Sequence, residues 1–178
     1  LLRRAQGGAV DIHPIGALSS KLAGKNLAEL HDLRAAGAVG FYDDGPVDHP
    51  EMLRRGLEYA ADTGVSVWAL PLEERLNPGA VMHEGVTSTQ LGLAGSPDIA
   101  ETMRLHRDLE IVRYTSGRLH VPLLTSAKAV AMMRHAKSEG LHVTCGVSAH
   151  HLLFCDEHLN GFQGALRTRT PFRSEADR

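Results

Sequence analysis

Aromatic residues are scarce in this sequence: phenylalanine, tyrosine and tryptophan make up only 4% of its 178 residues. The net charge is −2 with histidine neutral, so the chain has no general excess of basic residues. A chain without a basic face or stacking aromatics is not expected to bind nucleic acid. Long apolar runs are also missing, and no membrane association is predicted.

Cysteine and nucleotide-binding motifs are equally sparse. Cys145 and Cys155 are the two cysteines, and they do not form a CxxC pair. This excludes a disulfide framework, suggests buried thiols without chemistry, and favours a reduced, cytoplasmic protein. No GxGxxG or Walker loop follows a predicted strand, which argues against a nucleotide-binding sheet. Residues 1–10 lack both an initiating methionine and the apolar core of a signal peptide.

What the sequence does contain is a regular alternation of short apolar runs and amphipathic helices. Leu27, Leu30 and Leu33, for example, recur at helical spacing and not at the alternating spacing of a strand. Asp98 and Ser126 are expected to cap helices, and Gly117 to end one. The predicted strands cover residues 9–18, 38–42, 65–70, 119–124 and 141–147. The predicted helices cover residues 27–36, 50–63, 98–115 and 126–138, and a long loop covers residues 71–97.

This alternation predicts an α/β fold with a parallel sheet. Polar clusters follow the predicted strands, as they do at the mouth of a (β/α)8 TIM barrel, and a complete barrel needs about 250 residues. We therefore expect residues 1–178 to form a single, partial barrel domain that is truncated at both ends. Its last residues, 173–178, resemble a capping box that opens a further helix.

Residues 38–45, Ala-Val-Gly-Phe-Tyr-Asp-Asp-Gly, resemble the aGavaFSDDG stretch of the dihydroorotase family. Five further segments resemble motifs of that family in the same order: residues 13–18, 79–85, 91–97, 148–152 and 171–178. The resemblance covers almost the whole chain. It implies an interior fragment, about strands three to seven, of an amidohydrolase barrel.

The resemblance also implies which positions once carried chemistry. The family is a metal-dependent cyclic amidase that uses a zinc-bound hydroxide and a proton-moving carboxylate. Its metals are held by a His-x-His pair on the first strand, an Asp or modified Lys on the fourth, and a His on each of the fifth and sixth. Here Asp43 matches the strand-four ligand, whereas Leu70 and Leu123 fall on the two histidine positions, and Arg169 falls on a substrate-contacting Asn.

Leucine has no lone pair to offer zinc, and two isobutyl groups favour a dry site over a charged one. We therefore predict no catalytic residues, no bound cofactor, buried Leu70 and Leu123, and a structural role for Asp43 in its retained ligand position. His120 should point away from Leu123, towards the helices. His83, in the long loop, could reach the barrel mouth and supply one ligand at most.

Other features have simpler explanations. Asp43 and Asp44 precede Gly45 as in a tight turn. His150 and His151 are expected on an extended or capping segment with their side chains pointing apart. Arg167 and Arg169 near the barrel mouth could bind an anion, but surface or interface ion pairs are the favoured interpretation.

Three functional hypotheses follow from the resemblance. The favoured one is a non-catalytic dihydroorotase-like subunit, part of an oligomer, that supports assembly of the aspartate transcarbamoylase catalytic chain in pyrimidine biosynthesis. The second is an active dihydroorotase or related cyclic amidase that holds zinc on Asp43 and a first-strand histidine pair. The third is a small-ligand-binding module that uses the vacated barrel mouth.

Overall fold

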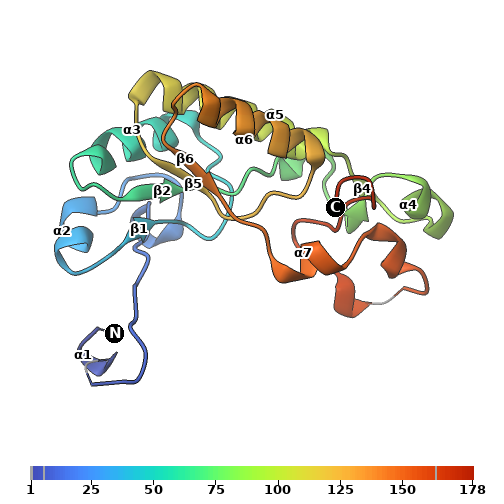
Figure 1. Ribbon diagram of the computed structural model, residues 1–178, viewed down its shortest axis with the longest axis horizontal. Coiled ribbons are helices and arrows are strands. Elements are labelled where there is room, and N and C mark those ends of the chain that lie inside the picture. Colours follow the sequence, from blue (N-terminus) through green and yellow to red (C-terminus); the bar gives the residue numbers. More distant parts are fainter. Residues whose placement is uncertain (1, 6, 163) are drawn as a thin grey trace.

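A four-stranded parallel sheet forms the centre of the computed structural model, which describes residues 2–5, 7–162 and 164–178 (Figure 1). Its strand order is β1-β2-β5-β6, and every neighbouring pair is parallel. The strands are β1 (Gly40–Phe41), β2 (Ser66–Trp68), β5 (Leu119–Val121) and β6 (Val143–Cys145). Because parallel neighbours need crossover connections, each strand is followed by a helical segment that returns the chain to the same end of the sheet.

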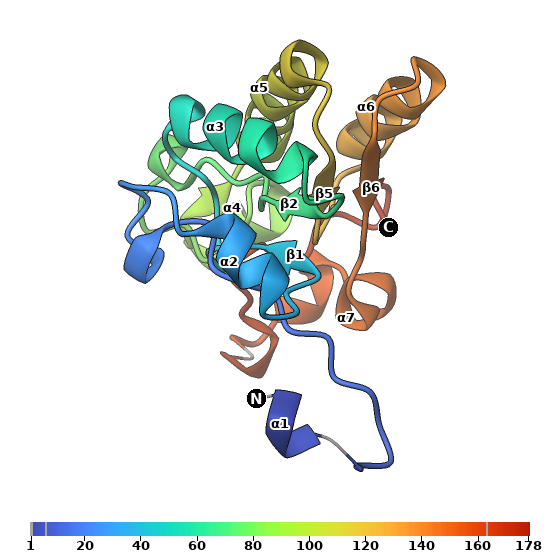
Figure 2. The same cartoon turned by 90° about the vertical axis from the view of Figure 1, so that its left-hand side faces the viewer.

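The crossover helices cover one face of the sheet, as Figure 2 shows for α3, α5 and α6. The helices are α2 (Leu30–Ala35), α3 (Pro50–Ala61), α5 (Ile99–Thr115) and α6 (Ala127–Ser138). Phe41, Val67 and Leu119 project from the strands into the main core, where they pack with apolar residues of the helices. None of the described helices is long and apolar enough to cross a membrane.

The predicted strand at residues 9–18 is not formed as a strand. Residues 9–13 are exposed and irregular, after a short helix α1 (Leu2–Ala5). Gly16 nevertheless runs parallel to β1, because its N–H donates to the Gly40 carbonyl and its own carbonyl accepts from Tyr42 N–H, both at 2.9 Å. Pro14 has no N–H to extend this ladder. The other four predicted strands are confirmed in shortened form.

The predicted helices are confirmed, but two of their end signals are wrong. Ser126 caps α6 by accepting a hydrogen bond from Ala129 N–H at 3.2 Å, as expected. The Asp98 side chain makes no capping bond to α5 and instead forms an ion pair with Lys128 at 2.7 Å. Helix α5 ends at Ser116, which adopts the left-handed conformation with φ 54°, one residue before the expected Gly117.

The segment predicted as a long loop, residues 71–97, has structure of its own. It contains a 3₁₀ turn (Glu74–Leu76), helix α4 (Val86–Leu91) and two short strands, β3 (Met82–His83) and β4 (Gly95–Ser96), which pair in parallel. Met82 is buried against Leu159 and Phe172 of the C-terminal segment, which carries α7 (Ala149–Leu153) and 3₁₀ turns at Asp156–Leu159 and Gly164–Leu166. A further 3₁₀ turn lies at Ser20–Leu22.

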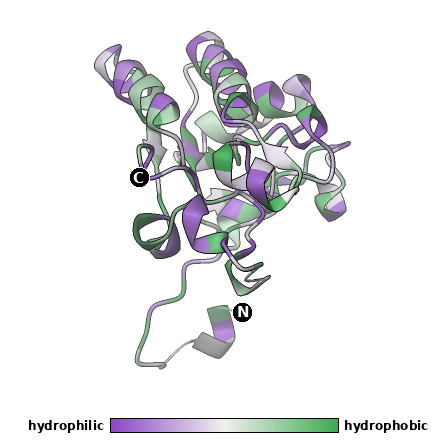
Figure 3. Cartoon of the chain, turned by 90° about the vertical axis from the view of Figure 1, so that its right-hand side faces the viewer, coloured by the Kyte–Doolittle hydropathy of each residue, from purple (hydrophilic) through white to green (hydrophobic). Residues whose placement is uncertain are grey.

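Residues 175–177 form a turn in which Asp177 N–H and Arg178 N–H donate to the Ser174 carbonyl, at 3.0 and 3.3 Å, and the predicted opening of a helix here stays a prediction. The Asp177 carboxylate accepts a hydrogen bond from Ala127 N–H at 3.0 Å, and the Ser174 hydroxyl donates to it at 2.7 Å. The carboxylate thus satisfies a free N–H in the first turn of α6. Figure 3 shows hydrophobic and hydrophilic residues side by side along the helices of the chain, and in α7 Leu152 and Leu153 are exposed.

The face of the sheet opposite the helices, here called the inner face, carries a row of polar and aromatic side chains. Trp68 contacts His120 in a tilted arrangement, with ring centroids 4.3 Å apart and an interplanar angle of 53°, and His120 Nδ1 lies 2.8 Å from the Thr144 hydroxyl. His120 therefore points away from the helices, and the opposite prediction is wrong. Leu119 and Val121 occupy the helix-facing positions, and the strand ends at Val121, so its alternation cannot be extended through to Leu123.

Candidate functional site

The three positions that the sequence singled out as metal-ligand positions, Asp43, Leu70 and Leu123, follow the carboxyl ends of β1, β2 and β5. In a parallel barrel these ends meet at one edge, where catalytic residues are placed. The candidate site is therefore this edge of the sheet, together with the segments that cover it: residues 71–97 and 167–173.

Asp43 is half-buried, and its carboxylate is used by the chain itself. It accepts hydrogen bonds from Leu18 N–H at 2.8 Å, from Ser19 N–H at 2.9 Å and from the Ser19 hydroxyl. The Ser19 hydroxyl oxygen in turn accepts from Gly24 N–H at 2.8 Å. These bonds fix the turn at residues 18–24 to the end of β1, and they support the predicted structural role of Asp43.

Leu70 and Leu123 come together in a small apolar cluster with Leu72 and Ala100. Leu70 is only 7% exposed, which confirms its expected burial, whereas Leu123 is only partly buried. The positions where histidines would supply nitrogen therefore present packed methyl groups. Within residues 2–5, 7–162 and 164–178, no group of three or more His, Cys, Asp or Glu side chains could hold a metal ion. The residues present do not fit a zinc site.

Arg169 joins the C-terminal segment to the end of β1. Its Nε atom lies 2.8 Å from Glu74 Oε1, and its Nη1 donates to the Asp44 carbonyl at 2.9 Å. The predicted ion pair is confirmed for Arg169. Arg167 makes no ion pair within the described parts of the chain, so for this residue the predicted surface or interface ion pair stays a prediction. Gly45 lies beside the Arg169 guanidinium group: a Cβ atom at this position would lie 3.0 Å from Nη1, and the Arg169 side chain would have to shift slightly to admit it.

A buried ionic cluster beneath the site was missed by the sequence analysis. Arg173 is 3% exposed; its Nη1 donates to the Ser96 carbonyl at 2.9 Å and lies 3.2 Å from His83 Nδ1. Its Nε donates to the Thr125 hydroxyl at 3.1 Å, and Glu101, equally buried, accepts from Thr125 N–H at 2.7 Å. The cluster connects residues 71–97, here called the ordered loop, as well as helix α5 and the end of β5, to the C-terminal segment.

The protonation of this cluster is set mainly by burial. Burial raises the pKa of Glu101, and the nearby Arg173 only partly opposes that shift. Burial and the Arg173 guanidinium both lower the pKa of His83, which favours a neutral imidazole. His83 is therefore a neighbour of Arg173 and is not grouped with other metal donors in the described structure. The PFRSEADR motif contains Arg173, but nothing in its spacing reveals Glu101 as a partner.

The remaining histidine and cysteine predictions are corrected in part. His151 lies in helix α7, and not on an extended segment; its ring contacts the Ser148 hydroxyl at 2.7 Å and the Thr170 carbonyl at 3.0 Å. Burial lowers the pKa of His151. Cys155 is buried as expected, whereas Cys145 is exposed because it ends β6 at the edge of the sheet.

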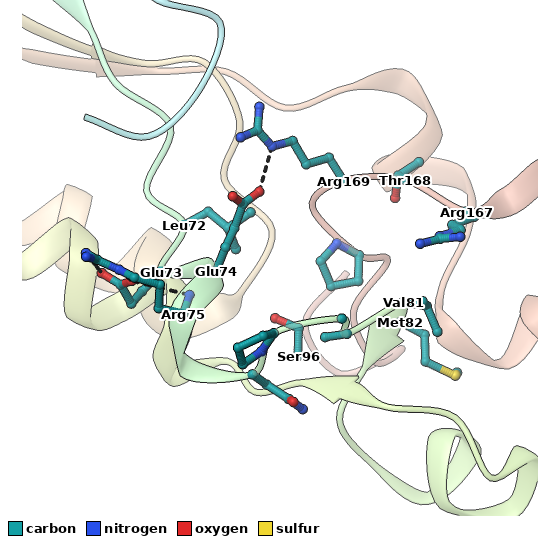
Figure 4. Close-up of a pocket in the computed structure, with 15 residues that line it drawn as sticks. Leu72, Glu73, Glu74, Arg75, Val81, Met82, Ser96, Arg167, Thr168 and Arg169 are labelled. Carbon is teal, nitrogen blue, oxygen red and sulfur yellow. Dashed lines mark hydrogen bonds and ion pairs between the residues drawn. The ribbon is translucent and has the colours of Figure 1, made fainter. Parts of the chain in front are cut away.

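A cavity of about 600 Å³ opens between the ordered loop and the C-terminal segment (Figure 4). One wall is formed by residues 72–82 and the other by residues 167–171, with Ser96 between them. A smaller hollow of about 330 Å³ contains Asp43 and Asp44. Glu74 and Arg169 line both, so their ion pair separates Asp43 from the larger cavity.

No protein-family model matches the chain. Among curated proteins, it is 40% identical over 171 residues to a dihydroorotase of Pelotomaculum thermopropionicum, covering 96% of this chain and 40% of that protein. It is 40% identical over 179 residues to a dihydroorotase of Deinococcus radiodurans, covering 99% and 43%, and 41% identical to one of Mycobacterium leprae, covering 98% and 41%. The chain thus spans about two-fifths of the length of these relatives.

Solved structures with a similar fold include the L-hydantoinase (dihydropyrimidinase) of Arthrobacter aurescens, with a TM-score of 0.73 and 20% identity over 93% of this chain and 38% of that one. A D-hydantoinase structure gives 0.69 and 18%, with the same coverage. At these identities the likeness shows the fold alone. Together with the parallel sheet and its covering helices, it confirms the prediction of an α/β fold that forms part of a (β/α)8 barrel.

Proposed function

Because this chain belongs to the dihydroorotase family, we propose that it acts as a non-catalytic dihydroorotase-like subunit that supports the assembly of aspartate transcarbamoylase in pyrimidine biosynthesis. The observation that carries the proposal is the apolar cluster formed by Leu70 and Leu123 at the family's two histidine positions. A fold that is retained around a site without metal-ligating histidines suggests a role in assembly.

The chemistry of the donors supports the loss of catalysis. Zinc binds nitrogen, sulfur and oxygen, and it generates the hydroxide nucleophile by lowering the pKa of its bound water. Leu70 and Leu123 offer no donor atom. The Asp43 carboxylate, the one ligand type retained, already accepts hydrogen bonds from Leu18 and Ser19. A metal ion at Asp43 would compete with these hydrogen bonds for the carboxylate lone pairs.

We place the partner contact on the outer side of the ordered loop. One side of this loop is anchored to the C-terminal segment through Met82 and Phe172, while Val86 at the start of α4 is 74% exposed. A loop held on a rigid scaffold is a common site of recognition. The expected partner is the catalytic chain of aspartate transcarbamoylase, in a cytoplasmic hetero-oligomer.

The first expected result concerns metal content. The full-length protein, purified without chelator, should contain substoichiometric zinc and should neither open nor close the dihydroorotate ring, because two of its ligand positions are leucine. Elemental analysis and a dihydroorotase assay would measure both. The dihydroorotase of Pelotomaculum thermopropionicum, treated identically, is the matched control. Two tightly held metal ions per chain would refute the proposal.

The second expected result concerns assembly. The full-length protein and the aspartate transcarbamoylase catalytic chain should co-elute in size-exclusion chromatography at physiological salt, with a contact that buries at least ~1,000 Å². Val86→Asp should abolish the co-elution, because it places a charge in the contact. Tyr114→Asp, on the equally exposed side chain at the far end of α5, should not. Separate elution of the unmodified proteins would contradict the assembly role, whereas an unaffected Val86→Asp variant would contradict only its location.

A second candidate function is an active zinc-dependent dihydroorotase or related cyclic amidase. The relatives at about 40% identity are named dihydroorotase, and Asp43 stands at a ligand position, which together favour this alternative. It requires a first-strand histidine pair outside these 178 residues. The metal analysis above separates the two functions directly.

A further inference from the structure

We propose that the cavity between residues 72–82 and 167–171 binds a small organic anion through the guanidinium group of Arg167. This site goes beyond the assembly role and does not depend on it. The cavity of about 600 Å³ lies within the range of roughly 300–1,000 Å³ that is typical of small-molecule sites.

The charges that line this cavity are not balanced. Glu73 is paired with Arg75 at 2.9 Å and with Arg104 at 2.7 Å. Glu74 is paired with Arg169 at 2.8 Å. Both lining carboxylates are therefore neutralised by other arginines. Arg167 is left with no acidic partner in the described parts of the chain, so it gives the cavity its uncompensated positive charge.

The unpaired arginine is directed at the cavity. Figure 4 shows the Arg167 side chain extending inward from the C-terminal segment, while Arg169 turns away toward Glu74. The backbone that carries Arg167 is held in place: its N–H donates to the Gly164 carbonyl at 3.1 Å, and the Thr168 hydroxyl donates to the Thr170 carbonyl at 2.7 Å. The guanidinium group is thus presented from a fixed segment.

The other lining residues indicate the class of ligand. Leu72, Val81 and Met82 provide an apolar wall, and Asn77 and Thr168 provide neutral polar groups. A guanidinium group binds carboxylate or phosphate with two parallel hydrogen bonds, in a geometry that lysine cannot reproduce. The arrangement suits a small molecule with one such anionic head and a short apolar body. Carboxylate and phosphate heads share this chemistry.

The test is titration of the full chain with butyrate, propyl phosphate and the neutral analogue butyramide, with binding measured by isothermal titration calorimetry and thermal melting. Butyrate or propyl phosphate should bind and raise Tm, and the tighter of the two identifies the head group. Butyramide should not bind. Arg167→Gln should weaken anion binding at least about tenfold, equivalent to about 1.4 kcal/mol.

Arg134→Gln provides the matched control, because Arg134 is an exposed arginine on α6 that does not line the cavity. This variant should bind the anion like the unmodified chain. Failure of both anions to bind, equal affinity in Arg167→Gln, or equally tight binding of butyramide would each overturn the proposal. Because the readout is binding to this chain alone, its outcome is independent of zinc content and of the partner.

Discussion

Replacing Arg104 by methionine is expected to lower the free energy of unfolding by about 3–5 kcal/mol, because it removes one partner from a buried ion pair. The Arg104 side chain is 1% exposed. It donates to the Val47 carbonyl at 2.8 Å, to Asp48 at 2.9 Å and to Glu73 at 2.7 Å. Methionine fills the volume but leaves the mostly buried Glu73 carboxylate and the Val47 carbonyl without this donor.

Urea denaturation of the unmodified chain and of the Arg104→Met variant would measure the loss in free energy of unfolding. Arg113→Met is the matched control, since Arg113 lies on the same helix but forms solvent-exposed pairs with Glu110 and Glu139. Exposed pairs contribute little, so the control should unfold nearly as the unmodified chain does. Equal stability of Arg104→Met and Arg113→Met would show that Arg104 does not stabilise the contact between the segments that follow β1 and β2.

Asp43→Asn should destabilise the chain by about 1–3 kcal/mol, because an amide NH₂ group would face donors that the carboxylate now satisfies. Those donors are Leu18 N–H, Ser19 N–H and the Ser19 hydroxyl. Ser19 is fully buried, so water cannot easily replace the lost bonds. The destabilisation should be the same in the presence and absence of chelator, because the role of Asp43 is to hold the turn at residues 18–24.

Asp44→Asn is the matched control for this substitution. Asp44 is exposed and has φ 58°, a conformation that asparagine adopts readily. Its free energy of unfolding should change by less than about 0.5 kcal/mol. Thermal melts with and without chelator would separate the two roles of Asp43. A chelator-sensitive melting temperature in the unmodified protein, lost in Asp43→Asn, would indicate that Asp43 binds metal.

Periodicity was sufficient to predict most of the fold. Helices α3, α5 and α6 carry regularly spaced apolar residues and are recovered within a few positions. The segment at residues 9–18 misled the analysis because its apolar, β-branched composition suggests a strand, although within it only Pro14, through its carbonyl, and Gly16 bond to the backbone of residues 39–42 along β1. Amino-acid composition is a local property, whereas the backbone hydrogen bonds of a strand need a neighbouring strand that lies alongside it.

The candidate site was predictable only where a motif marked it. The family resemblance located Asp43, Leu70 and Leu123, and the structure brings Leu70 and Leu123 into one cluster. Contacts between distant segments were not predictable: no local pattern pairs Arg104 with Glu73, or places Glu101 beside Arg173. Arg167 was expected to form an ion pair, but the nearby acidic side chains are already taken by other arginines.

The contact between the Trp68 and His120 rings gives the molecule a built-in optical reporter. The sequence contains a single tryptophan, so intrinsic fluorescence excited at the red edge of the absorption band comes from Trp68 alone. Its indole lies on the inner face of the sheet and donates a hydrogen bond to the Ser66 hydroxyl at 3.0 Å. A protonated imidazole quenches indole emission, and burial lowers the pKa of His120. The emission wavelength of Trp68 would therefore report, without a label, whether water or further polypeptide covers the inner face. Quenching of this emission at low pH would report whether the His120 imidazole can be protonated.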